Sequence, residues 1–247
     1  MKIEQISIDV SNYCRKGCPF CYNSSNQEGA TSWKVDEIIA FAKSCIENGV
    51  KAISLGGGEP LDYDGIFDVI AALYPLCYVT LTTNGLPLDR AHIISALKLY
   101  KPDKIHISIH HVDDGTEVCR VLRQVELLND LSIKPGVNLL VNDALIEKSK
   151  VVYMSLRHHL SSDQIILIPQ RFGHTPSPKQ LAEVSNGEPF QSPSCILCCS
   201  QPVKFASVSW DKKANWCSYA GGKQALPTLD YNGLVTALRA VHFEPCN

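Results

Sequence analysis

Three cysteines stand close together near the start of the chain, Cys14, Cys18 and Cys21 in the run CRKGCPFC. Thiolates at this CxxxCxxC spacing can converge on one iron–sulfur cluster. Three ligands for four irons leave one iron without a protein ligand, so that iron is open to a cofactor. The alternatives are a structural zinc site or scattered free cysteines. Zinc needs a fourth ligand, and Tyr22 and Asn23, which follow, are poor ones.

A second group of cysteines lies in the last fifth of the chain: Cys195, Cys198, Cys199, Cys217 and Cys246. The CxxCC run together with Cys217 supplies four ligands without Cys246, and zinc would satisfy the same count. The remaining three of the 11 cysteines, at positions 45, 77 and 119, are isolated. We expect these three to be buried as small hydrophobic side chains.

The composition restricts the classes of function. The 23 Lys and Arg residues against 25 Asp and Glu residues give a net charge of -2, which offers no basic field for nucleic acid. The N-terminus has no signal-peptide core, and no apolar run approaches the ~18 residues of a membrane span. We therefore expect a cytoplasmic protein without a membrane or nucleic-acid partner. In that reducing compartment, clustered cysteines bind metal or do redox chemistry more often than they form disulfides.

The elements that must position these cysteines alternate along the chain. Apolar runs predict strands at 3–10, 52–55, 78–82, 104–110, 136–141 and 164–168. Helical periodicity predicts helices at 33–48, 63–74, 89–100, 116–131 and 144–160. Strands joined by single crossover helices pair in parallel, so the pattern predicts an α/β fold, a partial (β/α)6 TIM-like barrel. Its sites should cluster at the carboxyl ends of the strands.

Three segments are predicted on this basis. Residues 1–171 form the barrel, 172–194 a connecting loop rich in proline, and 195–247 a small cysteine-rich C-terminal extension. The extension should contain a hairpin, with strands at 203–210 and 214–217, and a helix at 231–241.

The first cysteine run, with an aromatic residue (Phe20) before its last cysteine, resembles the signature of the radical S-adenosylmethionine (SAM) enzymes. The resemblance covers about residues 3–171. It implies a [4Fe-4S] cluster on Cys14, Cys18 and Cys21, with the open iron chelated by the methionine part of SAM. In that family, one electron from the cluster cleaves the sulfonium to give a 5′-deoxyadenosyl radical.

Further segments resemble the motifs with which this family binds SAM. The run GGGEP resembles its GGEP motif, so Gly57, Gly58 and Glu59 are expected at the methionine amino group. Asn84 and Ser108 stand where the family places polar contacts to the ribose or carboxylate. The family's GxIxGxxE pattern is only half present at 136–139, and Asn138 or Asn142 is expected to substitute for its adenine contacts. Taken alone, GGGEP and the pair Asn84-Gly85 are also ordinary turns.

Two residues at predicted strand ends are candidates for contact with a substrate. His110 follows the fourth strand and is a candidate substrate contact or proton acceptor. Arg171 follows the sixth strand and could bind a carboxylate or phosphate bidentately. A polar strand end and a solvated loop residue are the alternative interpretations.

The second cysteine group, with its predicted hairpin, resembles the Twitch form of the SPASM extension of the same family. This resemblance implies an auxiliary [4Fe-4S] cluster beside the substrate, held by cysteines of this group. The spacing leaves open whether Cys246 or one of the paired cysteines is the fourth ligand.

The predicted activity is hydrogen-atom abstraction from a small-molecule or peptide substrate, with an external reductant such as flavodoxin or ferredoxin. We expect a two-electron oxidation of a small metabolite, because the chain begins directly at the first strand, with no module to grip a leader peptide. The alternatives are crosslinking or epimerisation of a ribosomal peptide, activation of a glycyl-radical enzyme, and a non-catalytic iron–sulfur or zinc module.

Overall fold

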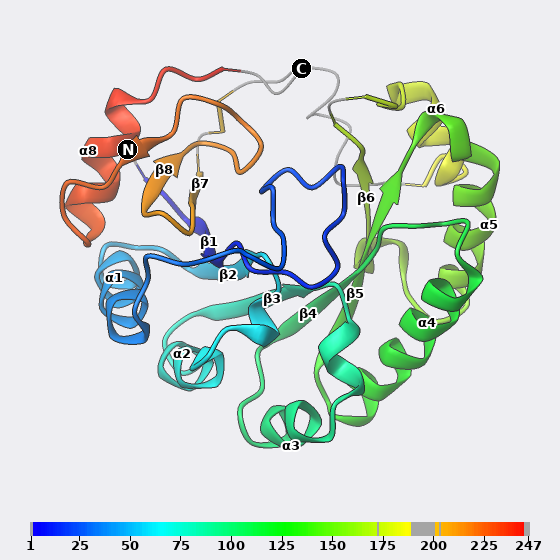
Figure 1. Cartoon of the computed structure of the whole chain (residues 1–247), viewed down its shortest axis with the longest axis horizontal. Coiled ribbons are helices and arrows are strands. Elements are labelled where there is room, and N and C mark those ends of the chain that lie inside the picture. Colours follow the sequence, from blue (N-terminus) through cyan, green and yellow to red (C-terminus); the bar gives the residue numbers. More distant parts are fainter. Residues whose placement is uncertain (1, 172, 189–200, 203, 245–247) are drawn as a thin grey trace.

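A computed structural model describes residues 2–171, 173–188, 201–202 and 204–244 of the chain (Figure 1). Six parallel strands follow one another in sequence order across one sheet. They are β1 (Gln5–Ser11), β2 (Ala52–Gly57), β3 (Tyr78–Thr83), β4 (Lys104–Ile109), β5 (Lys134–Val141) and β6 (Ile165–Pro169). The connecting helices are α1 (Val35–Glu47), α2 (Ile66–Leu73), α3 (Ala91–Leu99), α4 (Gly115–Asp130) and α5 (Ile146–Arg157). The expected α/β partial barrel is confirmed.

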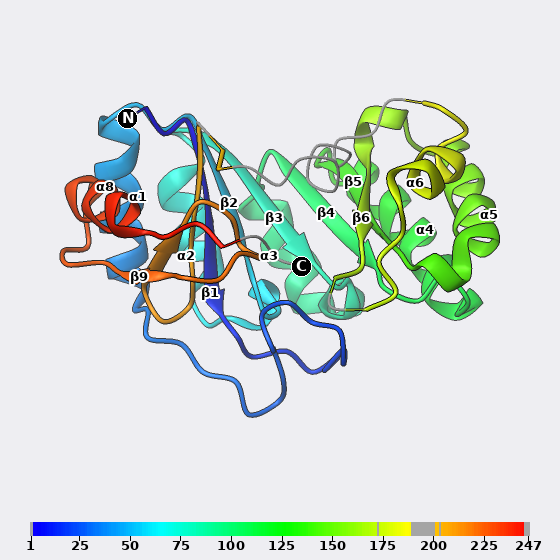
Figure 2. The ribbon, with the colours of Figure 1, turned by 90° about the horizontal axis from the view of Figure 1, so that it is seen from above.

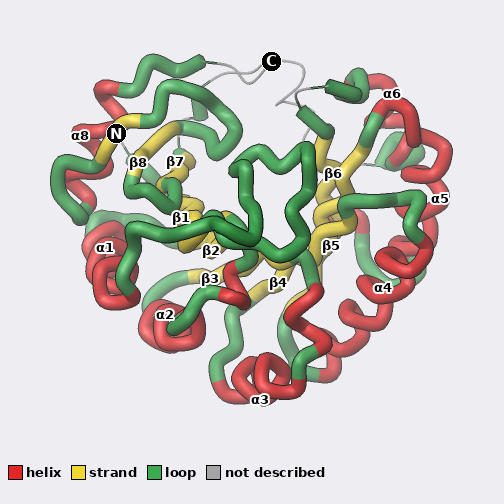
Figure 3. The backbone as a smooth tube through the Cα atoms, in the orientation of Figure 1, coloured by secondary structure: helices red, strands yellow, loops and turns green. Residues whose placement is uncertain are grey.

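The helices form an arc around the outside of the curved sheet (Figure 3). Alternate strand residues point outward and pack beneath them; Ile6, Ile8 and Leu55, for example, are fully buried. The intervening residues of β1 to β4 point inward and are mostly small or polar, whereas Leu140 of β5 and Ile168 of β6 are apolar and line the pocket. Ser7 lies beside Ser54, and Ser108 beside Asn138, in the strand register. The inner face of β1 to β4 is therefore more polar than the branched apolar filling of a complete barrel.

The C-terminal part of the chain extends the same sheet. Strand β7 (Phe205–Val208) pairs in parallel with β1, and β8 (Lys213–Asn215) and β9 (Gln224–Ala225) follow in antiparallel order. Helix α8 (Tyr231–Ala240) lies near α1 (Figure 1). The indole N–H of Trp33 donates to the carbonyl of Ser209 at 3.1 Å and joins the two parts. The expected hairpin and final helix are thus present.

The connection after β6 contains a helix that the sequence did not lead us to expect. Helix α6 (Pro178–Val184) begins with a capping box between Ser177 and Gln180, and it buries Leu181 and Val184. Seven residues are too few to show helical periodicity between prolines. The Ser177-to-Gln180 spacing was the available signal.

No helix in the described part of the chain is long and apolar enough to cross a membrane.

The turn after β2 is locked to the segment that follows β1. The backbone N–H of Gly58 donates to Ser11 O at 2.7 Å, and that of Glu59 donates to Tyr13 O at 2.8 Å. A Cβ atom on Gly58 would lie 2.1 Å from Tyr13 O, so only glycine allows this approach. Because Cys14 comes next, the lock fixes where the cysteine loop leaves the sheet. Figure 2 shows this loop, in dark blue, projecting beyond the strand ends.

We predict that Gly58→Ala lowers the free energy of unfolding by about 1–3 kcal/mol, because the added methyl group overlaps backbone that cannot move freely. Gly115→Ala is the matched control, since a Cβ there meets nothing within 4 Å. Urea unfolding of the two variants measures the difference. Equal stability of both variants would show that the two segments are not locked together.

Candidate active site

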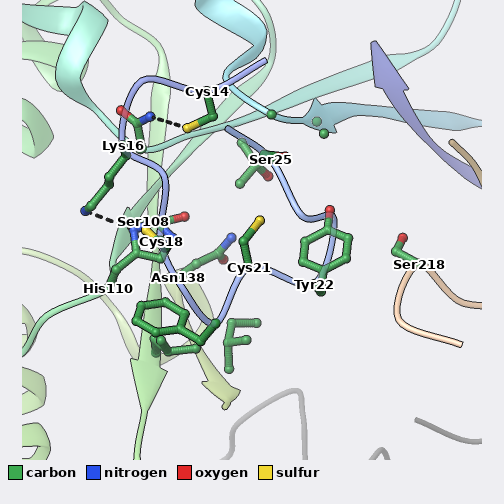
Figure 4. A pocket seen from close by; sticks show the side chains of 18 of the residues that line it. Cys14, Lys16, Cys18, Cys21, Tyr22, Ser25, Ser108, His110, Asn138 and Ser218 are labelled. Carbon is green, nitrogen blue, oxygen red and sulfur yellow. Dashed lines mark hydrogen bonds between the residues drawn. The ribbon is translucent and has the colours of Figure 1, made fainter. Parts of the chain in front are cut away.

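A pocket opens at the carboxyl ends of the barrel strands, and all six strands β1–β6 contribute residues to it. It brings together most of the side chains that the sequence singled out. The predicted residues that line it are Cys14, Cys18, Phe20, Cys21, Gly57, Gly58, Asn84, Ser108, His110, Asn138 and Arg171. Figure 4 shows the three cysteines around one space, with Ser108 and Asn138 nearby.

The cysteine loop is held by its own backbone. The N–H of Cys14 donates to Asn26 O at 2.9 Å, and that of Cys21 donates to Cys18 O at 3.1 Å. Gly17 adopts a φ of 57°, a left-handed conformation that suits glycine. Burial raises the pKa of the Cys18 thiol to about 11, and the charge of Lys16 acts in the opposite direction. A thiol in this setting needs a strongly positive partner to lose its proton.

The three cysteine thiols that face the pocket are a suitable donor set for an iron–sulfur cluster. Among the residues that the structure describes, no three His, Cys, Asp or Glu side chains converge tightly enough to hold one metal ion. The thiolates of a four-iron cluster bind different irons, so they stand farther apart than the ligands of one zinc ion. The donor set, three thiols facing one pocket, suits the cluster.

Glu59 lies behind the pocket wall rather than on it. It is 1% exposed. Its carboxylate accepts hydrogen bonds from the N–H of Leu61 at 3.1 Å, Thr83 Oγ at 2.7 Å and the N–H of Asn84 at 2.8 Å. Burial raises the pKa of Glu59 to about 7. The side chain thus ties the end of β2 to the end of β3.

Asn84 continues this connection to the cysteine loop. Its Nδ2 donates to Cys14 Sγ at 3.4 Å, and its Oδ1 accepts from the N–H of Leu86 at 2.8 Å. A fixed amide that donates to a ligand sulfur orients the ligand and stabilises its thiolate form. The structure therefore places Asn84 against a cysteine, a contact that its sequence context as a turn residue did not suggest.

Lys16 and Glu117 form an ion pair beside the cysteines. Lys16 Nζ lies 2.7 Å from both carboxylate oxygens of Glu117 and 3.1 Å from Nδ1 of His110. The backbone N–H of His110 donates to Glu117 Oε1 at 2.7 Å. Sequence reasoning missed this pair because its members are 101 positions apart and belong to no shared motif.

Lys16 also determines which ring nitrogen of His110 carries the proton. Since an ammonium group only donates, Nδ1 of His110 must accept, and the ring proton is on Nε2. Burial, followed by the charge of Lys16, lowers the pKa of His110 to about 3. His110 is therefore a neutral hydrogen-bond donor through Nε2, which favours a contact role over that of a proton acceptor.

Asn138 is fixed on the inner face of the sheet. Its Oδ1 lies 3.1 Å from Nδ1 of His106, whose pKa burial lowers to about 4. A Cβ on Gly136 would lie 2.9 Å from the His106 ring, so glycine makes room for this contact. Asn142, the other candidate on this segment, caps the next turn by accepting from the N–H of Ala144 at 2.8 Å.

Two tyrosines form a pocket wall that the sequence did not reveal. The rings of Tyr22, after the last cysteine of the loop, and Tyr219, after β8, are 4.5 Å apart. Both residues line the pocket. Behind them Asp9 is buried, and burial raises its pKa to about 6 while a hydrogen bond from Tyr22 acts in the opposite direction. Oδ1 of Asp9 has no hydrogen-bond partner among the described residues.

The second cysteine group is described only at Cys217. Cys195, Cys198, Cys199 and Cys246 lie outside the described residues. Cys217 is half-buried and directly precedes Ser218 and Tyr219, which line the pocket.

The three isolated cysteines differ from one another. Cys45 is buried as expected and Cys77 is partly buried. Cys119 is exposed on α4, so the expectation of burial was wrong there. The outer face of a surface helix tolerates a small thiol in solvent.

Glu59 predicts a pH dependence of stability. Its pKa of about 7 in the folded protein exceeds its ordinary value of 4.5. The contribution of Glu59 to the free energy of unfolding is full below pH 4.5. It is lost as the pH rises to about 7, because the unfolded chain releases the proton at a lower pH than the folded protein does. This difference in the pKa of Glu59 corresponds to about 3 kcal/mol of unfolding free energy. Urea unfolding without SAM, from pH 4.5 to 8, should show the free energy of wild type falling by this amount relative to Glu59→Gln. A pH-independent difference would contradict the prediction.

The sequence of this chain is similar to sequences of known proteins. A "Probable GTP 3',8-cyclase" of Methanocella arvoryzae is 30% identical over 112 residues, which is 45% of this chain and 36% of the relative. One from Saccharolobus solfataricus is 28% identical over 178 residues, 67% of this chain and 56% of the relative. The chain thus matches between about a third and just over half of the length of these curated relatives.

Two solved structures share the fold at low sequence identity. Streptococcus suis SuiB bound to its precursor peptide SuiA superposes with a TM-score of 0.68 at 16% identity, covering 87% of this chain and 60% of SuiB. The anSMEcpe structure with bound AdoMet and a peptide gives 0.65 at 13% identity, covering 95% of this chain and 82% of the other.

The model of the radical SAM superfamily matches residues 8–140, more than half of the 247-residue chain. This match includes the cysteine loop and strands β2–β4, whose ends form the pocket. The protein belongs to the radical SAM superfamily.

Proposed function

We propose that this radical SAM enzyme abstracts a hydrogen atom from a small organic substrate bound in the strand-end pocket. Its family implies a [4Fe-4S] cluster and SAM, which together supply a 5′-deoxyadenosyl radical. The observation that carries the proposal is that Cys14, Cys18 and Cys21 face the same pocket as the glycines at the end of β2, Gly57 and Gly58, and the inward side chains of β4 and β5.

The roles follow from the positions around the pocket. Cys14, Cys18 and Cys21 hold the cluster, and Asn84 orients Cys14. The exposed backbone at Gly57 and Gly58 lets SAM approach closely. Ser108 and Asn138, side by side in the register, offer a hydroxyl and an amide for its polar groups. Glu59 acts from behind by fixing the two strand ends, and Phe20 closes the pocket beside His110.

The charge of the pocket limits the substrate. In the described part of the chain, Lys16 and Arg171 are the lysine and arginine residues that line it, and Lys16 is paired with Glu117. The residues outside the description include no Lys or Arg. The cyclase relatives are named for GTP, a nucleoside triphosphate whose several negative charges need several cations. We propose a smaller organic substrate with fewer negative charges than a nucleoside triphosphate, bound in contact with Arg171.

The net reaction proposed is a two-electron oxidation of that metabolite. An auxiliary [4Fe-4S] cluster on Cys217 and three of Cys195, Cys198, Cys199 and Cys246 would accept the second electron. The position of Cys217 supports this, since the next two residues line the pocket. We propose that residues 195–247 carry this cluster as a Twitch-like extension of the barrel.

A peptide is the second candidate substrate. Strand β6 is at the end of the strand order, and its residues Ile168 and Pro169 line the pocket. An extended peptide could pair with such an edge next to the reacting centre. Incubating the reduced enzyme with metabolites and with peptides, and scoring deuterium transfer into 5′-deoxyadenosine, separates the two candidates.

We predict that the protein, reconstituted anaerobically, reduced with dithionite and given SAM, forms 5′-deoxyadenosine, whereas Cys18→Ala forms none because the cluster loses a ligand. Cys119→Ala is the matched control, since Cys119 is exposed on α4 and should leave the yield unchanged. Chromatographic quantification of 5′-deoxyadenosine is the measurement. A wild-type protein with a full cluster that gives no product, with or without the candidate substrates, would refute the radical chemistry.

We predict that a variant with alanine at Cys14, Cys18 and Cys21 retains about four irons per chain after reconstitution, held by the auxiliary cysteines. Adding Cys217→Ala should remove them. Metal analysis of both variants provides the test. A single zinc per chain in the triple variant would contradict the prediction and show that these cysteines form a structural zinc site.

A further inference from the structure

We propose that the charges of the Lys16–Glu117 ion pair set the redox potential of the cluster held by the cysteine loop. The proposal rests on the proposed function, in that the loop must hold a cluster. It concerns two residues that are neither cluster ligands nor expected contacts of SAM. Each of them carries a full charge close to the place where the cluster gains and loses its electron.

The pair joins three parts of the site. Lys16 stands between Cys14 and Cys18 in the loop, and Glu117 lies in the first turn of α4. Glu117 also accepts the backbone N–H of His110 directly after β4, at 2.7 Å. The loop, the end of β4 and the start of α4 are thereby held by one carboxylate. The N-terminal turn of the 16-residue helix α4 further favours the negative charge of Glu117.

The pair is shielded from water. The side chain of Lys16 is 12% exposed and that of Glu117 is 6% exposed. The ring of Phe20 lies against His110 and His111, with centroid distances of 6.1 and 5.6 Å. Figure 4 shows Lys16 reaching from the loop to His110. Charges in such a site interact strongly, and removing one member of a buried pair leaves the other uncompensated.

The two charges act on the cysteine loop with opposite sign. Lys16 lies in the cysteine loop itself, and both carboxylate oxygens of Glu117 lie 2.7 Å from its ammonium group. The positive charge of Lys16 and the negative charge of Glu117 therefore oppose each other at a cluster held by the loop. Reducing the cluster adds a negative charge, so an unpaired Lys16 stabilises the reduced form and an unpaired Glu117 destabilises it.

The experiment compares midpoint potentials of the reconstituted cluster, measured by titration followed with electron paramagnetic resonance. Glu117→Gln should raise the potential and Lys16→Met should lower it. The double variant Lys16→Met/Glu117→Gln should return close to the wild-type value. Glu147→Gln is the matched control, because it breaks the ion pair of an exposed carboxylate, 84% exposed, with Lys150 and should leave the potential unchanged.

A role confined to tethering the loop would not move the potential in opposite directions. Iron per chain and urea unfolding without a cluster show whether each variant still folds and loads, and the double variant should be more stable than either single one. Loaded variants whose potentials are equal, or shift in the same direction, overturn this inference and leave the proposed function standing. A folded wild-type protein that assembles no cluster overturns both.

Discussion

The buried carboxylate of Glu59 is the interaction on which the pocket depends. Glu59 follows β2 and accepts from Thr83 and Asn84 at the end of β3, while the backbone of its own turn donates to the segment that leads from β1 to Cys14. Three strand ends are thus fixed relative to one another by one side chain and two backbone bonds. Asn84 extends the connection to the sulfur of Cys14. The loop that carries the cysteines is rigid at the point where it leaves the sheet, because its entry is part of this network.

The sequence predicted the barrel well because each strand and each long helix has its own local spacing of apolar residues. Ile6, Ile8 and Val10 alternate along β1, and the long helices show one apolar face. The predicted boundaries accordingly differ from the observed ones by only a few residues. The cysteine spacing and the GGGEP turn identified the strand ends that matter for the same reason, since each motif is a short continuous run. Polar residues at strand ends then met at the pocket, because parallel strands present their carboxyl ends at one edge.

Contacts between distant segments could not be predicted in this way. Lys16 and Glu117, Tyr22 and Tyr219, and Trp33 and Ser209 each join segments whose separation in sequence carries no periodic signal. Helix α6 was missed because it is shorter than the window in which periodicity can be seen. His110 shows the limit most clearly: its place at a strand end was predictable, but its proton position is decided by a lysine 94 residues away. The order of side chains around the pocket came from the sequence pattern, whereas their protonation states came only from three-dimensional packing.

Strand β1 has the longest-range partner in the sheet. Gln5 pairs with Phe205, 200 positions later in the chain, while its other neighbour, Ala52, is much closer. Closing a loop of that length is entropically unfavourable, so the contacts among β2 to β6 form more readily than the β1–β7 pair. During synthesis, one edge of β1 stays unpaired until the last part of the chain has emerged. The strand that leads directly into the cysteine loop is thus completed late, and a partly made chain exposes an open sheet edge beside three free thiols. Folding order and protection of these thiols are therefore linked through a single strand pairing.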